Sequence, residues 1–500
     1  MQYMQRPRWQ VHNTSIKHLL LVLIIILGGQ TVAQNVTFKK RIDNGLDNRG
    51  TGLIEVDSSY IILGWGYSMI DPTIYIKIYK TDFTGNVIAF REYGESNTFW
   101  ETGIGSVFKA NDGSYVFGGT RRYLNRDEGL IVKFDLNLDT LWTNSVPSSS
   151  HIFFYQGREA LDGGFVFIGS SDENDPNANY LLLKTDSLGN ELWRKEYGGI
   201  YRDIGRNIEV TLDGGYILSG DRFQDASMNS RIGYLVKTDS VGNIEWDKYF
   251  GTSGNDGLFF VNTINSNGYL IWGNIDTLGS STPIAFLAKI DDSGNIIWRT
   301  VFTQYNRAFI LQSRQLSNNT ILSAGEIRND SLFGPIAWIV KHDENGNKLW
   351  ERFYYWNKDS MLGMAINDFI ETSDGGILAT GFAYKTESNG ISRSQFLLMK
   401  LDSNGCLVND CGLFTGIEEY VPQQTLQARI YPNPTTGTLT IELPNGQGGS
   451  MALYNLLGQS VYQTTLAGGQ TTLALNLPPG LYLYRIGSGG KAVNGKLLVE

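Results

Sequence analysis

The chain has 500 residues, 58 of them glycine, two cysteines and a formal net charge of −9. This length is enough for one large and one small domain. The negative charge and the lack of a basic run argue against nucleic-acid binding, and the glycine- and aromatic-rich composition favours an all-β surface protein.

Residues 1–33 are predicted to be a signal peptide. Basic residues up to Lys17 precede the apolar run 19–27, and Thr31-Val32-Ala33 offers a small-residue cleavage site. A membrane anchor is the alternative, but the apolar run is short of the roughly 20 residues that span a bilayer. No later segment is suited to cross as a helix, so no transmembrane span is expected in the mature chain.

A ten-residue pattern, Lys-x-Asp-x-x-Gly-Asn-x-x-Trp, recurs roughly every 52 residues and marks a repeat architecture. Three copies are degenerate. In the copy at Lys80 we interpret Phe90 as the replacement for Trp, and the copy at Lys133 has Leu138-Asp139 in place of Gly-Asn. The copy at Lys400 diverges after its Gly. The complete copies start at Lys184, Lys237, Lys289 and Lys341.

A second pattern, Asp-Gly-Gly-aromatic followed three residues later by Gly, runs in phase with the first. It is complete at Asp162 and Asp213. Degenerate copies end at Gly64, Gly119, Gly273, Gly325 and Gly381, which again gives seven copies.

Each repeat is predicted to form four short strands. In the fourth repeat these are residues 207–211, 216–219, 232–237 and 244–246, which are rich in β-branched and aromatic residues and are separated by Gly, Asn and Asp turns. Four strands repeated radially make a propeller blade. The sequence therefore predicts a seven-bladed β-propeller over residues 35–412.

Two sets of repeat residues are assigned structural roles. Turn chemistry explains the fixed aspartates, since Asp can bond the backbone two residues on. The tryptophans are expected to pack between neighbouring blades. The aspartates are Asp82, Asp135, Asp186, Asp239, Asp291, Asp343 and Asp402, and the tryptophans are Trp142, Trp193, Trp246, Trp298 and Trp350.

The repeat turn resembles the Asp-box of sialidase-type propellers and the repeat of pyrroloquinoline-quinone enzymes. In this chain the Asp-to-Gly spacing is one residue shorter than in the quinone repeat, and no vicinal cysteine pair exists. We therefore interpret the motif as structural.

The two ends of the repeat region complement each other. Residues 35–42 resemble the last strand of a repeat without its first three, whereas the last repeat lacks that strand after Gly405. We expect the N-terminal strand to complete the seventh blade, which leaves no unpaired edge.

Cys406 and Cys411 are the only cysteines. In an exported protein they are expected to form a local disulfide, with two free thiols as the alternative. Residues 413–429 lack repeats and are predicted to be a linker.

Residues 430–500 change in character and predict a small immunoglobulin-like antiparallel β-sandwich of about seven short strands. The segment also closely resembles the type A C-terminal sorting domain of the type IX secretion system of Bacteroidetes. The resemblance lies in the opening YPNP block, the LYNLLGQ block, the PPGLY block and the terminal GKLLV. The residues that carry it are Tyr431, Pro432, Asn433, Pro434, Gly437, Gly458, Gly480, Tyr482 and Lys496.

The resemblance implies export to the periplasm and then passage through the outer membrane by the type IX machinery, which is thus an expected partner. Such a domain is usually removed during that step. The cargo is then secreted or attached to the outer cell surface.

Few catalytic groups are available. His151 and His342 are the only histidines after the predicted signal peptide, so a Ser-His-Asp triad or a three-histidine zinc site lacks parts. The acidic loop Asp172–Asp175 lacks the ordered spacing of a calcium loop. No catalytic residue, metal or cofactor is therefore assigned.

Aromatic residues outside the repeat positions are the candidates for ligand binding, with packing as the alternative. Two function classes remain open. The first is a non-enzymatic module that binds an extracellular glycan or protein, and the second is a polysaccharide hydrolase or lyase with channel carboxylates. The candidates are Trp65, Trp100, Trp272 and Trp356, with Tyr67, Tyr354 and Tyr355 nearby in the sequence pattern.

Overall fold

The computed structural model divides into two compact parts, Met1–Cys411 and Gly412–Glu500. We call their described residues the repeat region and the C-terminal domain. The predicted signal peptide and most of the predicted linker lie outside the described residues. The structure describes residues 36–42, 47–67, 73–94, 99–123, 126–146, 151–171, 177–225, 230–251, 256–265, 268–276, 283–305, 307–328, 334–356, 363–386, 392–407, 428–443, 448–455, 460–488 and 491–500.

We number the repeats 1 to 7 by the lysines of the first pattern. The strands of repeats 1 to 3 and the N-terminal strand are β1 (Phe38–Ile42), β2 (Asn48–Val56), β3 (Ser59–Tyr67), β4 (Ile74–Asp82), β5 (Val87–Tyr93), β6 (Phe99–Glu101), β7 (Val107–Lys109), β8 (Tyr115–Tyr123), β9 (Arg126–Phe134), β10 (Thr140–Val146), β11 (Ile152–Glu159), β12 (Phe165–Ser171), β13 (Asn179–Thr185) and β14 (Glu191–Tyr197).

The strands of repeats 4 to 7 are β15 (Asp203–Val210), β16 (Tyr216–Phe223), β17 (Arg231–Thr238), β18 (Ile244–Phe250), β19 (Gly257–Thr263), β20 (Tyr269–Asp276), β21 (Pro283–Ile290), β22 (Ile296–Val301), β23 (Arg307–Gln315), β24 (Ile321–Arg328), β25 (Ile336–His342), β26 (Lys348–Tyr354), β27 (Met364–Glu371), β28 (Ile377–Thr386) and β29 (Ser392–Leu401). The strands expected in repeat 4 are present, and each is longer than expected.

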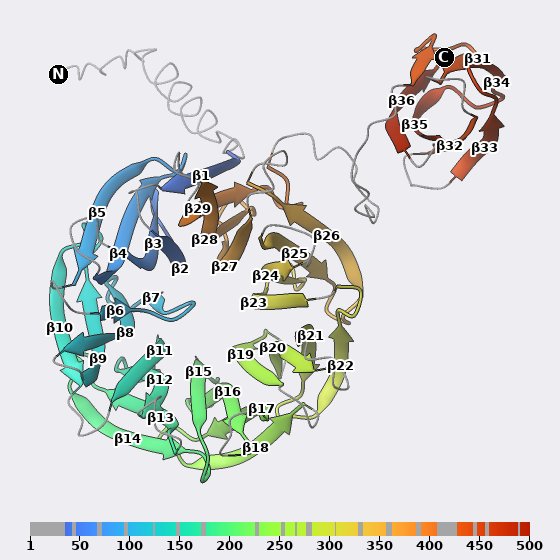
Figure 1. Cartoon of the computed structure of the whole chain (residues 1–500). Helices are drawn as coiled ribbons and strands as arrows, with labels where there is room; N and C mark the ends of the chain where they lie inside the picture. Colours follow the sequence, from blue (N-terminus) through green and yellow to red (C-terminus); the bar gives the residue numbers. More distant parts are fainter. Residues whose placement is uncertain are drawn as a thin grey trace, which may run out of the picture. The chain divides into compact units, whose positions relative to one another are not determined.

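Among the described residues, the repeat region forms five four-stranded antiparallel sheets and one nine-stranded sheet. Four of the sheets are meanders in chain order, β11–β14, β15–β18, β19–β22 and β23–β26. The nine-stranded sheet holds repeats 1 and 2, which are joined where Phe99 of β6 pairs with Ile74 of β4. Figure 1 shows the sheets one after another around a ring, with the first strand of each repeat nearest the middle.

The N-terminal strand pairs with the last repeat, as the sequence predicts. β1 runs antiparallel to β29, with Phe38 opposite Lys400 and Ile42 opposite Phe396. Figure 1 shows β1 beside β29 although the two are far apart in the sequence. This pairing covers the edge that β29 would otherwise expose.

Burial follows the position of a strand within its sheet. The middle strands are buried on both faces, as in β12, where Val166 to Ile168 are fully buried. The last strand of each repeat consists mostly of exposed and half-buried residues, which alternate in β10. The buried faces pack against the neighbouring sheets, so the inner strands are apolar runs and the outer ones alternate.

The repeat turns are held by their aspartates. Asp186 Oδ1 accepts hydrogen bonds from the backbone N–H of Leu188 and Asn190, at 2.9 and 2.8 Å. Gly189 adopts φ of 80°, the left-handed region that glycine enters without strain. Equivalent bonds recur at Asp239, Asp291 and Asp343, as expected of a turn motif.

Each repeat tryptophan lies against the turn glycine of the next repeat. A Cβ placed on Gly242 would lie 3.0 Å from the ring of Trp193, and one on Gly405 would lie 2.8 Å from that of Trp350. Phe38 of β1 takes the same place against Gly85 of repeat 1, at 2.6 Å. A side chain at these glycines would displace the ring, which explains why ring and glycine occur together.

The prediction that Phe90 replaces the tryptophan of repeat 1 is wrong. Lys80 pairs with Ala89, just as Lys184 pairs with Trp193, so Ala89 occupies the tryptophan position. Phe90 lies on the opposite face of β5, 47% exposed, with its ring centroid 4.7 Å from that of Tyr79. The aromatic residue of this copy therefore lies one position after the place that tryptophan takes in the complete copies.

The inner strands are joined by side-chain amides. Gln156 Oε1 of β11 accepts a hydrogen bond from the N–H of Ile208 in β15 at 2.9 Å, and Asn207 Oδ1 accepts one from the N–H of Val261 in β19 at 2.7 Å. Asn367 Nδ2 of β27 donates to the carbonyl of Gly50 in β2 at 2.8 Å. Polar groups near the middle of the repeat region thus link successive repeats, including the last to the first.

The C-terminal domain contains two antiparallel sheets, ordered β30-β31-β34 and β33-β32-β35-β36. One cluster of apolar side chains joins them, including Ile441, Leu453, Ile486 and Leu497. The strands are β30 (Arg429–Tyr431), β31 (Thr438–Glu442), β32 (Gly449–Tyr454), β33 (Ser460–Leu466), β34 (Gln470–Ala474), β35 (Gly480–Ser488) and β36 (Lys491–Val499).

Cys406 is bonded in a disulfide, and its thiol is not free. Cys411, its expected partner, lies outside the described residues, so the pairing stays a prediction. Within the described part of the chain, no helix has the length and apolar character that a membrane crossing requires.

Candidate functional site

Two of the four candidate tryptophans belong to the hydrophobic core. Trp272 in β20 is fully buried and stacked on Phe260, with ring centroids 5.5 Å apart. Trp100 in β6 is 5% exposed and packs in the cluster shared by repeats 1 and 2. For both residues the structure supports packing, the alternative that the sequence left open.

The other two candidates lie beside cations. The guanidinium of Arg49 lies 5.7 Å from the Trp65 ring and 4.6 Å from that of Phe382. Trp356 is covered by Arg41 of β1, at 4.3 Å from the ring centroid. These contacts link the N-terminal strands to the last repeats, so both tryptophans have a structural role that accounts for part of their surface.

The three tyrosines near these candidates differ in exposure. Tyr67 is 38% exposed at the end of β3, and Tyr355 is half-buried. Tyr354 is buried, and its hydroxyl donates to the carbonyl of Gly405 at 2.6 Å. Tyr354 therefore joins repeats 6 and 7.

Two carboxylates of the inner strands, Glu209 and Asp368, form ion pairs with arginines. Glu209 of β15 accepts two hydrogen bonds from Arg158 of β11, at 2.6 and 3.0 Å. Asp368 of β27 accepts from Arg314 of β23 at 3.0 Å. A glycosidase uses two carboxyl groups across a cleft, one of them as a proton donor. Glu209 and Asp368 are instead engaged in charge-assisted hydrogen bonds with arginine, which is bidentate at Glu209.

Repeat 4 buries two further carboxylates on adjacent strands, Asp203 in β15 and Asp221 in β16. Arg206 donates to Asp221 at 2.8 Å. Asp203 accepts from the N–H of Gly199 at 2.7 Å, and burial raises the pKa of its carboxyl group to about 6. A carboxyl group that titrates near neutral pH is the kind of group that can exchange protons.

The histidines have structural surroundings. His342 is fully buried at the end of β25, and desolvation lowers the pKa of its imidazole to about 4. His151 lies 2.8 Å from Asp127 Oδ2, and Asp127 also binds Arg122 at 2.6 Å. Neither histidine neighbours a serine or cysteine nucleophile in the contacts that the described residues make.

The acidic loop Asp172–Asp175 lies outside the described residues. Asp343, in the other acidic stretch, binds the backbone of Asn345 and Asn347 at 3.0 and 2.8 Å and has the turn role expected of it. Within the described ranges, no three His, Cys, Asp or Glu side chains form a group that could hold a metal ion.

Two cavities flank β18, the last strand of repeat 4. The first, of about 410 Å³, is lined by Ile200, Tyr201, Arg222, Phe223, Gln224, Ile232 and Tyr249. Its volume lies within the roughly 300–1,000 Å³ range of ligand pockets. Arg222 Nη1 donates to the Tyr249 hydroxyl at 2.8 Å. The lining combines aromatic and apolar surface with one cation, as many ligand sites do.

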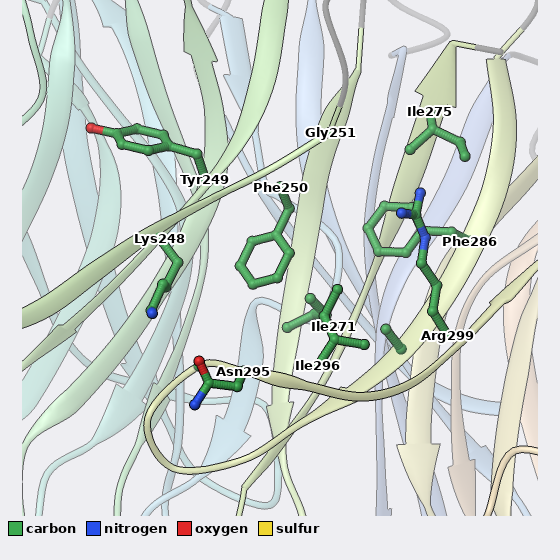
Figure 2. Close-up of a pocket in the computed structure, with 12 residues that line it drawn as sticks. Lys248, Tyr249, Phe250, Gly251, Ile271, Ile275, Phe286, Asn295, Ile296 and Arg299 are labelled. Atoms are coloured by element: carbon green, nitrogen blue, oxygen red, sulfur yellow. The ribbon is translucent and has the colours of Figure 1, made fainter.

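Figure 2 shows the second cavity, of about 370 Å³, which lies between repeats 4 and 5. Ile271 and Phe286 are buried, whereas Lys248 is half-buried and Arg299 is exposed. Phe250 faces this cavity, and the neighbouring Tyr249 side chain points away from it in Figure 2. The cavity is thus apolar within and cationic at its entrance.

The second cavity arises where a repeat hydroxyl is missing. In repeats 3 and 6 the position of Phe250 is a tyrosine, and the hydroxyls of Tyr197 and Tyr354 donate to Gly242 and Gly405 of the next repeat, at 2.7 and 2.6 Å. Phe250 has no hydroxyl to bridge to Gly294. The second cavity is therefore explained as a looser junction between repeats.

The opening and closing blocks of the sorting motif are bonded to each other in the C-terminal domain. Asn433 Nδ2 donates to the carbonyl of Lys496 at 2.7 Å, and Asn433 Oδ1 accepts from the N–H of Leu498 at 3.0 Å. Tyr482 is 8% exposed, with its hydroxyl bonded to Pro478 at 2.8 Å. The motif thus fixes the terminal strand β36.

The remaining motif residues have separate positions. Tyr431 donates to Glu442 at 3.0 Å, and Gly437 has φ of 114°, which disfavours other residues. Gly480 begins β35 in an extended conformation. Pro432 and Pro434 flank Asn433 on the stretch after β30, and Gly458 lies outside the described residues.

The comparison with protein families supports the resemblance seen in the sequence. Residues 429–500 match the family described as the secretion system C-terminal sorting domain. The match covers the C-terminal domain alone. No protein of curated function matches the chain.

Solved structures of low sequence identity resemble the chain more broadly. They include PorZ, described as an essential bacterial surface component of the type IX secretion system of Porphyromonas gingivalis, with 11% identity over 90% of this chain and 75% of that one, and a TM-score of 0.34. The β-propeller domain of the Trilobed protease from Pyrococcus furiosus shares 8% identity over 74% of this chain and 99% of that one (TM-score 0.41). The polysaccharide lyase Uly1 shares 9% sequence identity over 71% of this chain and 90% of that one (TM-score 0.42). At these TM-scores the likenesses carry no argument about function.

Proposed function

We propose that the chain is an exported protein whose repeat region is a closed seven-bladed β-propeller that binds an extracellular glycan or protein without catalysing a reaction. The observation that carries the export role is the sorting-domain match over residues 429–500. The type IX machinery would recognise this domain. The propeller would then be secreted or held at the outer surface after passage through the periplasm.

The number of blades is supported by seven in-phase copies of both sequence patterns. Closure is supported by contacts from the last repeat to the first. Besides the β1 pairing, the Ser373 hydroxyl and N–H donate to Glu55 at 2.9 and 2.6 Å. For the C-terminal domain, two sheets around one core support an immunoglobulin-like sandwich.

Binding is favoured over catalysis by the ion pairs of the inner strands. Glu209 and Asp368 are both bonded to arginines of the preceding repeat, which favours a structural role for both carboxylates. The cavity beside Arg222 and Tyr249 instead combines an aromatic surface with a cation.

Asp203 favours the alternative, a polysaccharide hydrolase or lyase. Its carboxyl group is buried, and desolvation raises its pKa to about 6. A buried carboxyl group of raised pKa is the kind of group that a glycosidase uses as its general acid.

A glycan array probed with the purified full-length protein separates these functions when it is read for both binding and cleavage. Retention of a glycan without release of shorter products is expected. Cleavage that Asp203→Asn abolishes would establish the enzyme instead. Absence of binding to any glycan, together with no protein captured from the cell surface, would contradict the proposed function.

The export role is tested separately. Residues 413–500 fused to a reporter should carry it to the cell surface of a host with type IX secretion, and a chain ending at Cys411 should stay in the periplasm. A reporter that stays inside, or a truncated chain that still reaches the surface, would refute this role.

A further inference from the structure

The cavity of about 410 Å³ beside β18 is built around a single cation. The Arg222 guanidinium lies 5.1 Å from the ring centroid of Tyr234 and 5.3 Å from that of Tyr249. These rings and the Tyr249 hydroxyl fix the orientation of the guanidinium. A second arginine, Arg202, lies 5.6 Å from the ring of Phe223, which also lines the cavity.

In repeat 2 the equivalent arginine, Arg121, is paired with a glutamate. Arg121 and Arg222 both follow the conserved glycine of the second pattern by two residues. Arg121 pairs across the sheet with Glu128 and binds its carboxylate at 2.6 Å. It also donates to Ser145 at 2.8 Å, as Arg222 donates to Tyr249.

Arg222 of β16 lies opposite two residues, Ile232 of β17, which lines the cavity, and Asp203 of β15. On the β17 side, the carboxylate that binds Arg121 in repeat 2 is therefore replaced by an apolar side chain. On the β15 side, Asp203 forms a longer ion pair, with its Oδ1 3.9 Å from Arg222 Nε, beyond hydrogen-bond distance. The Arg222 side chain is also partly exposed, at 25%.

We propose that this cavity binds the carboxylate of an acidic sugar residue, with Arg222 as the anion-binding group and Tyr249 and Tyr201 as apolar surfaces for the pyranose ring. Arginine recognises planar carboxylates through paired N–H donors. Aromatic rings with a polar tip supply contact area with little loss of conformational entropy. The inference rests on the proposed function and specifies its ligand class.

The shape of the site fits one sugar residue within a chain. The openings lie at the surface, where Ile200 is 75% and Tyr249 is 51% exposed, so neighbouring residues of an oligosaccharide could extend into solvent. A buried site closed on all sides would exclude such a chain.

The test uses the full-length protein and oligogalacturonate as the probe, with the methyl-esterified oligosaccharide as a neutral match. Calorimetric titration should show binding of the acid at least tenfold tighter than of the ester. Arg222→Ala should weaken binding of the acid at least tenfold, and Arg222→Lys less. A sulfated oligosaccharide with the same backbone distinguishes a carboxylate site from a general anion site.

A second variant tests the site without removing its arginine. Ile232→Glu reproduces the Arg121–Glu128 pair of repeat 2 and should abolish binding of the acid while the melting temperature stays within a few degrees of the parent. Arg121→Ala is the matched control and should leave binding unchanged.

Equal binding of acid and ester, or no loss in Arg222→Ala and Ile232→Glu, would overturn the proposal. So would failure of oligogalacturonate and of oligoglucuronate to bind at millimolar concentration. A glycan array on which other ligands still bind would in that case leave the broader binding function standing. An array without any ligand, together with no protein captured from the cell surface, would refute both.

Discussion

Two junctions between neighbouring repeats are filled in different ways. The junction between repeats 3 and 4 packs a large residue against a small one, and the junction between repeats 1 and 2 reverses which position is large. At the first, the large Trp193 meets Gly242. At the second, the small Ala89 stands in the tryptophan position, and Leu138 replaces the glycine. Leu138 is 2% exposed and joins the apolar cluster that Ala89 packs against. The repeat therefore conserves volume at the junction rather than particular residues.

This exchange has a conformational cost. Leu138 adopts φ of 70° because the turn keeps the backbone of the glycine copies. Left-handed backbone costs a residue with a side chain about 1–2 kcal/mol. Burial of the leucine, about 2 kcal/mol, offsets it.

Repeat 6 departs from the pattern without such compensation. His342 stands where repeats 1, 3 and 4 have a threonine, and in repeat 3 the Thr185 hydroxyl bonds to the carbonyls of Phe165 and Asp186. Both ring nitrogens of His342 are buried without a hydrogen-bond partner among the described residues. Asn318 also replaces the aspartate of the second pattern. The substitutions at Ala89 and Leu138 compensate each other in volume, whereas those at His342 and Asn318 leave buried polar groups without their usual partners.

The last repeat is the extreme departure, because its outer strand comes from the other end of the chain. Deletion of residues 36–42 would remove the partner of β29 and the ring of Phe38 from Gly85. We expect a loss of about 4 kcal/mol or more in the free energy of unfolding, together with aggregation through the exposed edge.

Thermal unfolding and light scattering measure both effects, and a chain lacking only residues 1–35 is the control. A shortened chain that melts with the control and stays monomeric would contradict closure by β1.

The junction exchange is tested by a double-mutant cycle. Leu138→Gly should cost about 3 kcal/mol by leaving a cavity, and Ala89→Trp about 2 kcal/mol by overpacking. The double variant recreates the arrangement of Trp193 and Gly242 and should lie within about 1 kcal/mol of the parent. Urea unfolding of the four proteins measures the coupling. Additive losses in the double variant would show that the two positions are independent.

The sequence predicted the four-stranded repeats, the turn aspartates and the N-terminal strand because each depends on local spacing. It misassigned Phe90 because one aromatic residue within one position of the pattern looks like a match, and only the pairing of Lys80 with Ala89 reveals the shift. The sequence could not identify Trp272 as fully buried, since burial depends on the neighbouring repeat.

The cavity beside Arg222 was missed for a related reason. Arg222 and Tyr249 are 27 residues apart in the chain and meet only through the pairing of three strands. One signal was present in the sequence: an arginine recurs two residues after the conserved glycine in repeats 2 and 4, and only repeat 2 has a glutamate on the next strand.

Repeat 6 provides a pH-dependent test. Burial holds the pKa of His342 at about 4, below its value of about 6.5 in an unfolded chain. Between these values the unfolded state binds more protons, so stability falls as the pH is lowered from 6.5 to 4. His342→Thr should remove this dependence, which amounts to about 2 kcal/mol between pH 7.5 and pH 5.

Denaturant unfolding at the two pH values measures this change. Thr238→His in repeat 4 is the reciprocal variant and should introduce the same dependence. Parallel pH profiles for the parent and His342→Thr would show that the imidazole is not held neutral.

The smallest expected effect concerns the lysines of the first pattern. In repeats 2, 3, 4 and 7 the lysine is buried and bonded to the aspartate of the second pattern, as in Lys184–Asp162 at 2.9 Å and Lys400–Asp374 at 2.9 Å. In repeat 6 the same turn carries Asn318, and Lys341 is 8% exposed with no ion pair among the described residues. Desolvation accordingly lowers the pKa of Lys341.

Asn318→Asp should restore the ion pair. The backbone already fits, because Asn318 Oδ1 accepts from the N–H of Thr320 at 3.1 Å, as Asp162 Oδ1 accepts from that of Gly164 at 3.0 Å. The carboxylate would be largely exposed, as Asp162 is at 61%, so screening limits the gain to about 0.5–1 kcal/mol. The gain should shrink in 1 M salt and vanish in the Lys341→Met background, where the new carboxylate has no partner. A gain that survives both changes would arise from the turn itself and would refute the ion-pair explanation.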